Sequence, residues 1–217
     1  MIQQEYELKF AVTDERIAEL ETQLVDSGFL LDFDHRETDY VPDTPEYLMR
    51  QNSFMIRFRG FQAAEGSDIL YTLKDKRERE DVQHYQELQA KFSDPEITEV
   101  FTEVNQRLAE LGIDPVPNEV LRLQTLDEII PVVRAAGLTG NRMLSDKDRK
   151  QYSRGDLVVT IDRLPKDIGQ FVELEAPTKE AVYTLKDELG FADQDIDTRN
   201  YGLIIQTAQK ERGATEE

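Results

Sequence analysis

The sequence contains no cysteine among its 217 residues. This absence excludes disulfide bonds, thiolate metal sites and cysteine nucleophiles. No segment approaches the roughly 18 consecutive apolar residues that a transmembrane helix requires. The first ten residues also lack the basic and then apolar pattern of a signal peptide. We therefore expect a cytoplasmic protein that has no membrane partner.

Positive charge is scarce, because 26 lysines and arginines stand against 45 aspartates and glutamates, which gives a formal net charge of −19. Broad nucleic-acid binding requires a positive face, so we expect no nucleic-acid partner. Only two histidines occur, and neither has a partner at metal-ligand spacing. No P-loop, dinucleotide-binding glycine fingerprint or Ser-His-Asp arrangement appears. The chemistry must therefore be sought among carboxylates, lysines and arginines.

Alternation of apolar and polar side chains predicts about eight strands. In Phe54–Arg59, for example, three apolar residues alternate with Arg57 and Arg59. Turn signals separate the strands at 66–68, at the Pro42 and Pro45 loop and at two later glycines. The predicted strands cover residues 2–10, 29–40, 54–59, 69–76, 83–92, 141–152, 157–163 and 170–176.

Helical spacing of apolar residues predicts helices over 13–28, 94–112, 126–136 and 180–189. Thr13 is the expected N-cap of the first helix, and Val25 belongs to its apolar stripe. Residues 199–207 fit either a strand or a helix. We expect a single domain over 1–210, with a helical excursion at about 93–138 and a frayed acidic tail at 211–217.

The charged faces of the strands determine the predicted architecture. One face of nearly every predicted strand carries Lys, Arg or Glu, whereas a solvated strand face is normally more mixed. A repeated charged face favours a polar lumen, with the apolar face packed on helices outside. We predict an α+β fold, a closed eight-stranded antiparallel β-barrel (tunnel) with a charged lumen and helices packed outside.

Two Glu-x-Glu pairs are candidates for metal binding. Glu5 and Glu7 point to one side of the first strand, and Glu173 and Glu175 repeat this spacing near the end of the chain. Asp162 lies on the strand just before the second pair. Facing carboxylates repel one another unless a cation lies between them, and Mg²⁺ or Mn²⁺ prefers oxygen ligands. The alternative is a solvated strand face with incidental acids.

Basic residues share the non-apolar phase of their strands. Arginine forks match phosphate oxygens, and lysine supplies a point charge. A basic lining inside an acidic protein favours a small polyanion, whereas the alternative is ordinary surface ion pairing. The residues concerned are Lys9, Arg57, Arg59, Lys74, Lys76, Lys147 and Arg149.

A series of short motifs accompanies these charges. The first is Glu5-Tyr6-Glu7-Leu8-Lys9, at the start of the chain. It is followed in order by Asp39-Tyr40, Ser53–Arg59, Leu70–Lys74, Tyr85–Gln89, Lys147–Tyr152, Asp162 with Gly169 and Phe171–Glu175, and Arg199–Tyr201. Together the motifs resemble the CYTH superfamily, also called triphosphate tunnel metalloenzymes, from residue 2 to about 205. The sequence departs from the family pattern at Gln89, which replaces an acid, and in its extra helix between 88 and 125.

The resemblance implies roles for particular residues. It implies that divalent metals bind to Glu5, Glu7, Glu173 and Glu175, with Asp162 as a further ligand. It implies that Lys9, Arg57, Arg59, Lys74, Lys147 and Arg149 bind the triphosphate. Lys74 or Lys76 would act as general base. Three further residues are candidates for contacting the metal ligands without binding the metal themselves, namely Glu87, Tyr40 and Arg199.

The same resemblance implies Mg²⁺- or Mn²⁺-dependent hydrolysis of inorganic triphosphate or thiamine triphosphate. One alternative is a class IV adenylate cyclase, which makes cyclic AMP and pyrophosphate from ATP. A second is a non-catalytic polyphosphate- or nucleotide-binding module. Cyclisation also requires a nucleoside-binding site that orients the ribose hydroxyl. The sequence shows no adenine pocket, so we favour hydrolysis. The expected partner is a small triphosphate-containing substrate, and a homodimer is left open.

Overall fold

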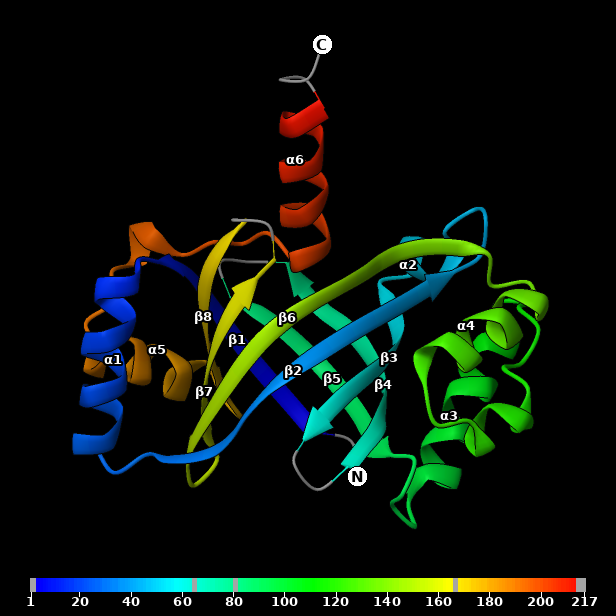
Figure 1. The fold of residues 1–217 in the computed structure, drawn as a ribbon, viewed down its shortest axis with the longest axis horizontal. Helices are drawn as coiled ribbons and strands as arrows, with labels where there is room; N and C mark the ends of the chain where they lie inside the picture. The colour runs from blue at the N-terminus through cyan, green and yellow to red at the C-terminus, as the bar shows by residue number, and fades with distance from the viewer. Residues whose placement is uncertain (1–2, 64–65, 80–81, 166–167, 214–217) are drawn as a thin grey trace. The chain divides into compact units, whose positions relative to one another are not determined.

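The computed structural model describes residues 3–63, 66–79, 82–165 and 168–213. Within these ranges eight antiparallel strands form a closed barrel in the order β1-β5-β4-β3-β2-β6-β7-β8. Six α-helices lie outside the barrel strands (Figure 1). The predicted α+β class and the closed eight-stranded barrel are therefore confirmed.

Each predicted strand and helix has a counterpart in the described residues. The strands are β1 Gln3–Val12, β2 Leu30–Asp43, β3 Phe54–Ala63, β4 Gly66–Arg79, β5 Gln83–Lys91, β6 Gly140–Arg154, β7 Leu157–Leu164 and β8 Gly169–Ala176. The helices are α1 Asp14–Asp26, α2 Leu48–Gln51, α3 Ile97–Glu110, α4 Leu126–Ala135, α5 Lys179–Glu188 and α6 Tyr201–Gly213, with short 3₁₀ turns at Asn118–Arg122 and Asp193–Asp195.

The chain divides into two compact units. The first unit comprises residues 1–4, 35–77 and 85–146, and the second comprises 5–34, 78–84 and 147–217. A single domain over 1–210 stays a prediction. Of the tail predicted at 211–217, residues 214–217 lie outside the described part of the chain.

In the first unit, β3 and β4 pack their apolar face against the helical excursion. Ile56 and Phe58 on β3 and Tyr71 on β4 are fully buried. Val104 on α3 and Ile129 on α4 belong to the same core cluster. The excursion at 93–138 therefore covers one side of the β3–β4 pair, while the alternate residues of these strands form the opposite face.

In the second unit, the apolar face of β1 and β8 packs against α1 and α5. Phe10 and Leu174 belong to one core with Leu24 of α1 and Leu185 of α5. Thr13 caps α1 by accepting a hydrogen bond from the backbone N–H of Arg16. Val25 is 64% exposed, so its predicted place in the apolar stripe was wrong. Its Cβ lies about 100° around the helix from that of buried Leu24.

Two predicted turns were also misplaced. β2 runs through Pro42 and ends at Asp43, because a strand end tolerates proline. The Asp43 carboxylate then accepts hydrogen bonds from the N–H groups of Thr44, Met49 and Arg50, which fixes the turn after the strand. Gly66 pairs with Ala63 in the β3–β4 register, so the turn predicted at 66–68 belongs to strand β4.

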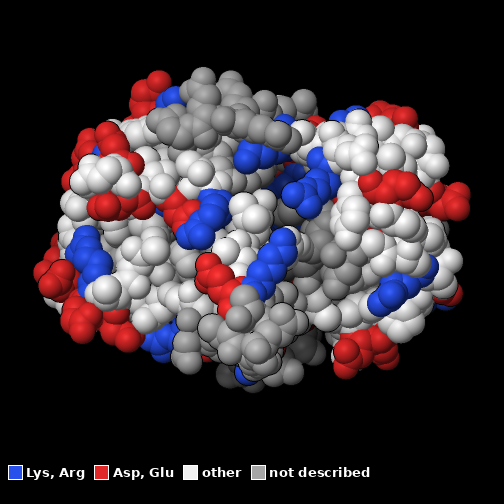
Figure 2. Space-filling view, turned by 90° about the horizontal axis from the view of Figure 1, so that it is seen from above, with Lys and Arg blue, Asp and Glu red and all other residues white. Residues whose placement is uncertain are grey.

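On the face in Figure 2, acidic side chains are spread widely, with basic side chains between them. Among the helices that the structure describes, none combines the length and the apolar character needed to cross a lipid bilayer.

Candidate functional site

Six buried charged side chains of the second unit come from four strands that are consecutive in the barrel. They alternate with the core residues of β1, β6, β7 and β8, so in a closed barrel they point to its interior. All are at most 6% exposed, and they are Glu7, Lys9, Lys147, Arg149, Asp162 and Glu173. Buried charges of this number must be paired or bind ligands.

Three carboxylates of the second unit form a group. Glu7 on β1 lies opposite Glu175 on β8 in the strand register, and Glu5 lies two residues before Glu7. One oxygen from each carboxylate lies within 4.8 Å of the others. Oxygens bound to one octahedral Mg²⁺ lie about 3–4 Å apart, so the group fits a divalent cation after a small adjustment. The structure thus brings together three of the five predicted ligands.

Glu173 lies against cations. It is opposite Lys9 in the register, and Lys9 Nζ is 3.0 Å from its Oε1. Arg149 Nη2 donates to its other oxygen at 2.7 Å. Burial alone would raise the pKa of Glu173, but Lys9, Arg149 and Lys147 hold that pKa well below its usual range. Glu173 is therefore a carboxylate, with both oxygens close to positive charge.

Lys9 lies between two carboxylates. Besides Glu173, its Nζ is 3.5 Å from Glu7 Oε1. Burial lowers the pKa of Lys9, but Glu173 and Glu7 outweigh that effect and raise it above the usual value. Lys9 therefore stays protonated, as a residue that binds an anion should.

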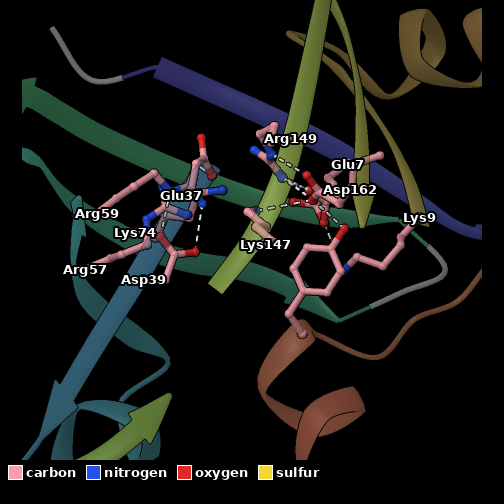
Figure 3. A network of polar contacts seen from close by, with 12 residues as sticks. Glu7, Lys9, Glu37, Asp39, Arg57, Arg59, Lys74, Lys147, Arg149 and Asp162 are labelled. Carbon is pink, nitrogen blue, oxygen red and sulfur yellow. Dashed lines mark hydrogen bonds and ion pairs between the residues drawn. The ribbon is translucent and has the colours of Figure 1, made fainter. Parts of the chain in front are cut away.

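Asp162, the fifth predicted ligand, is surrounded by donors (Figure 3). It is fully buried, and Arg149 Nε donates to one oxygen at 2.6 Å. The other oxygen accepts from Arg149 Nη2 at 2.5 Å, from Lys147 Nζ at 3.3 Å and from the Tyr201 hydroxyl at 2.6 Å. Asp162 thus pairs with Arg149 and Lys147 in this structure, and it is not part of the group formed by Glu5, Glu7 and Glu175.

Two residues of the C-terminal segment contact these buried charged side chains, Arg199 at Lys9 and Tyr201 at Asp162. Arg199, predicted to act behind the metal ligands, pairs through its side chain with Asp197 at 2.6 Å. Its backbone carbonyl accepts a hydrogen bond from Lys9 Nζ at 3.2 Å. Sequence reasoning noted Tyr201 only as part of a motif and gave it no role.

In the first unit, Arg59 on β3 is held by two carboxylates of β2. Its Nε and Nη2 donate to Asp39 at 2.6 and 2.9 Å, and its Nη1 lies 3.0 Å from Glu37. Sequence reasoning missed Glu37, although its position two residues before Asp39 places both on one face of the strand. His35 Nε2 lies 3.0 Å from the second oxygen of Glu37.

Arg57 has looser contacts than Arg59. Its Nη2 lies 3.5 Å from Glu87 and donates to Thr72 at 3.4 Å. Its Nε is buried and has no hydrogen-bond partner among the described residues. Because buried N–H groups are normally satisfied, this donor suits a ligand oxygen.

Lys74 and Lys76 on β4 lie over one aromatic ring. Their Nζ atoms are 4.6 and 5.7 Å from the ring centroid of Tyr85 on β5. Glu87 lies 3.5 Å from Lys74 Nζ. Glu87, which was predicted to contact the metal ligands, therefore contacts Arg57 and Lys74, two predicted phosphate-binding residues.

Tyr40 lies on the other face of its strand. It is buried in the apolar core of the first unit and stacks on Phe58, with ring centroids 6.2 Å apart. The structure thus places it among core residues and not among charged side chains. Gln89, at the end of β5, is exposed. Of the six predicted phosphate-binding residues, three lie in each unit.

Comparison with known proteins identifies the family. A sequence model described as the CYTH domain matches residues 3–201. The chain belongs to the CYTH family. Members of this family are triphosphatases or adenylate cyclases, and they are in general metal-dependent. No curated protein sequence matches the chain significantly.

Solved structures share the CYTH fold. A protein from Vibrio parahaemolyticus, described as an adenylate cyclase candidate, is 18% identical with a TM-score of 0.61, over 95% of this chain and 99% of that one. A protein from Pyrococcus horikoshii OT3 is 18% identical with a TM-score of 0.63, over 94% and 99%. An adenylyl cyclase candidate from Hippeastrum, described as having a dominant triphosphatase activity, is 19% identical with a TM-score of 0.55, over 96% of each chain. At these identities the similarities show the fold alone.

Proposed function

We propose that the chain hydrolyses a small triphosphate, either inorganic triphosphate or thiamine triphosphate, with Mg²⁺ or Mn²⁺. The observation that carries this proposal is the group formed by Glu5, Glu7 and Glu175. One carboxylate oxygen from each residue lies within 4.8 Å of the other two. The buried cations of the same unit, among them Lys9, supply charge for a polyanion. Oxygen ligands beside cations are the parts that phosphoanhydride hydrolysis requires.

The residues divide into three roles in this proposal. Glu5, Glu7 and Glu175 hold the cation, and Asp162 and Glu173 stay predictions as further ligands, since cations contact both in this structure. When bound, the ion supplies Lewis acidity to the phosphoryl group. The phosphate oxygens bind to Lys9, Arg57, Arg59, Lys74, Lys147 and Arg149.

The third role is proton transfer from the attacking water. Lys74 and Lys76 are the proposed general bases. Both lie on β4, over the ring of Tyr85 on the neighbouring strand β5. Arg57 Nε, which is buried without a partner in the described part of the chain, supports anion binding on the face of the β3–β4 pair that also carries Lys74.

Phosphorus NMR tests the proposal. The purified protein is given Mg²⁺ or Mn²⁺ with inorganic triphosphate, thiamine triphosphate and ATP in separate reactions. We expect orthophosphate from one of the first two substrates, and no release when EDTA removes the metal. Cyclic AMP and pyrophosphate from ATP would instead assign the cyclase reaction. Binding without any turnover would favour a binding module.

A matched pair of variants tests the metal group. Replacing Glu5 and Glu7 together by Gln removes two ligands, and we expect turnover to fall by roughly 100-fold or more. The control is Glu99→Gln with Glu103→Gln, which neutralises two exposed acids of α3. Equal activity of the two double variants would contradict the assignment of the metal site.

A further inference from the structure

Tyr201, the first residue of α6, contacts two lysines through its ring. Lys9 Nζ lies 4.3 Å from the ring centroid, and Lys147 Nζ lies 5.0 Å from it. Both distances are within the range of a cation–π interaction. The ring also forms a T-shaped pair with Phe171 of β8, with centroids 5.6 Å apart. The ring therefore has a fixed place beside two ammonium groups.

The hydroxyl of Tyr201 has a separate contact. It donates to Asp162 Oδ2 at 2.6 Å. Burial and the charges of Asp162 and Glu173 raise the pKa of Tyr201 well above its usual value. The phenol therefore stays protonated and acts as a neutral donor to the carboxylate that also accepts from Lys147.

The backbone before Tyr201 is tied to β1. Ile196 forms a β-bridge with Phe10, and the Asp197 N–H donates to the Lys9 carbonyl at 2.7 Å. The Lys9 ammonium in turn donates to the Arg199 carbonyl. These contacts hold the segment before α6 against the strand that carries Lys9, so the position of Tyr201 is set by the strand and not by α6 alone.

From these contacts we propose that Tyr201 is a positioning residue that holds Lys9 and Lys147 ready for substrate phosphates and fixes Asp162 beside them. The inference rests on the proposed function, since it assigns a role within that phosphate-binding site. Burying two ammonium groups is costly, and the Tyr201 ring and the Asp162 carboxylate both offset that cost. Long lysine side chains lose rotamer freedom when they bind a ligand, so holding them beforehand lowers the entropic cost of binding.

Two substitutions separate the roles of the ring and the hydroxyl. Tyr201→Phe keeps the ring on the lysines and removes the donor to Asp162. Tyr201→Leu removes both. The matched control is Tyr183→Leu on α5, because the Tyr183 ring also lies near two lysines, Lys179 at 6.0 Å and Lys186 at 5.7 Å. Thermal unfolding by circular dichroism verifies that each variant folds.

The readouts are KM and kcat for inorganic triphosphate with Mg²⁺, and calorimetric binding of inorganic triphosphate in EDTA. For Tyr201→Leu we expect KM to rise roughly 3- to 30-fold with kcat changed by less than about threefold, because the lost interaction positions phosphates rather than reacting atoms. The dissociation constant in EDTA should rise by a similar factor. Tyr201→Phe should lie between this variant and the wild type, and Tyr183→Leu should match the wild type.

The outcomes distinguish the two proposals. If the wild type turns over triphosphate and Tyr201→Leu keeps its KM within twofold, the positioning role is overturned. A fall in kcat at constant KM would also overturn it, because Tyr201 would then act in the chemical step. Equal effects of Phe and Leu would overturn the role of the ring. If the wild type neither binds nor hydrolyses triphosphate, the proposed function itself fails, and the inference fails with it.

Discussion

At the scale of single residues, Asp162 shows how this fold accommodates charge inside a barrel. Its two oxygens accept four hydrogen bonds, from Arg149, Lys147 and Tyr201. A buried carboxylate with so many donors offsets much of its lost hydration. The cations depend on it equally, because Arg149 and Lys147 are themselves buried.

Replacing Asp162 by Asn should therefore destabilise the protein. The amide side chain keeps a hydrogen-bonding oxygen but removes the charge, which leaves two buried cations undercompensated, and we expect the free energy of unfolding to fall by about 3 kcal/mol. Urea unfolding at pH 7 in EDTA measures the change. The control is Asp14→Asn, since Asp14 pairs with Arg163 in an exposed ion pair at 3.2 Å, and we expect an effect below about 1 kcal/mol. Similar losses in both variants would contradict the argument.

The period-two pattern predicted which residues of a strand share the charged face, but not their partners. Lys9 pairs with Glu173 because the β1–β8 register places them opposite each other. That register joins segments at opposite ends of the sequence, so no local pattern reports it. Tyr40 follows Asp39 directly and therefore lies on the opposite, apolar face. Tyr201 is brought to the cluster by the fold of the C-terminal segment.

At the scale of elements, α1 is linked to β6 by a polar contact outside the apolar core. Glu21 of α1 accepts a hydrogen bond from Lys150 Nζ at 2.7 Å and from the Tyr152 hydroxyl at 3.0 Å. Burial and the hydrogen bond to Glu21 raise the pKa of Tyr152 to about 12. The contact between these elements is therefore sensitive to alkaline pH.

This contact predicts a pH dependence of stability. Tyrosine ionises near pH 10 in an unfolded chain, whereas folded Tyr152 ionises near 12. The contribution of Tyr152 to the free energy of unfolding is therefore fully present below about pH 10 and is lost as the pH rises toward 12. We expect the unfolding free energy of the wild type to fall more steeply over this interval than that of Tyr152→Phe. Urea titrations at several pH values measure both slopes, and equal slopes would refute the prediction.

The element that the sequence left undecided was residues 199–207. Leu203, Ile204 and Ile205 fit a strand or a helix equally well in a short window. The structure forms α6, and the Asn200 side chain accepts a hydrogen bond from the Leu203 N–H at 2.9 Å. The helices predicted at 13–28, 94–112, 126–136 and 180–189 were confirmed, because their apolar stripes are longer and their ends carry signals such as the N-cap Thr13. The short helix α2 was not predicted.

At the scale of the whole molecule, the net charge of −19 and the paired cations have different consequences. The six predicted phosphate-binding cations each have a carboxylate within ion-pair distance, so the surplus of negative charge lies mainly at other residues. Excess charge of one sign destabilises the folded state by self-repulsion, and salt screens this repulsion between exposed groups more than it screens buried pairs.

Added salt should therefore stabilise the protein. Raising NaCl from 0.1 to 1 M shortens the Debye length from about 10 to 3 Å, and we expect Tm to rise by about 2–5 °C. Differential scanning calorimetry in NaCl and in KCl measures the shift and shows whether it depends on the cation. A fall in Tm with either salt would mean that attractive surface pairs outweigh the general repulsion.

The pairing of β1 with β8 also has a consequence for biosynthesis. β1 leaves the ribosome before the other strands of the barrel, yet Glu7 meets Glu175 only when the chain has been made as far as β8. The group of Glu5, Glu7 and Glu175 therefore forms only after β8 has been made, and a chain that ends before Glu175 has no complete carboxylate group. Until that point β1 presents an unsatisfied edge to the cell, which is the interval in which a nascent chain of this fold most needs protection from aggregation.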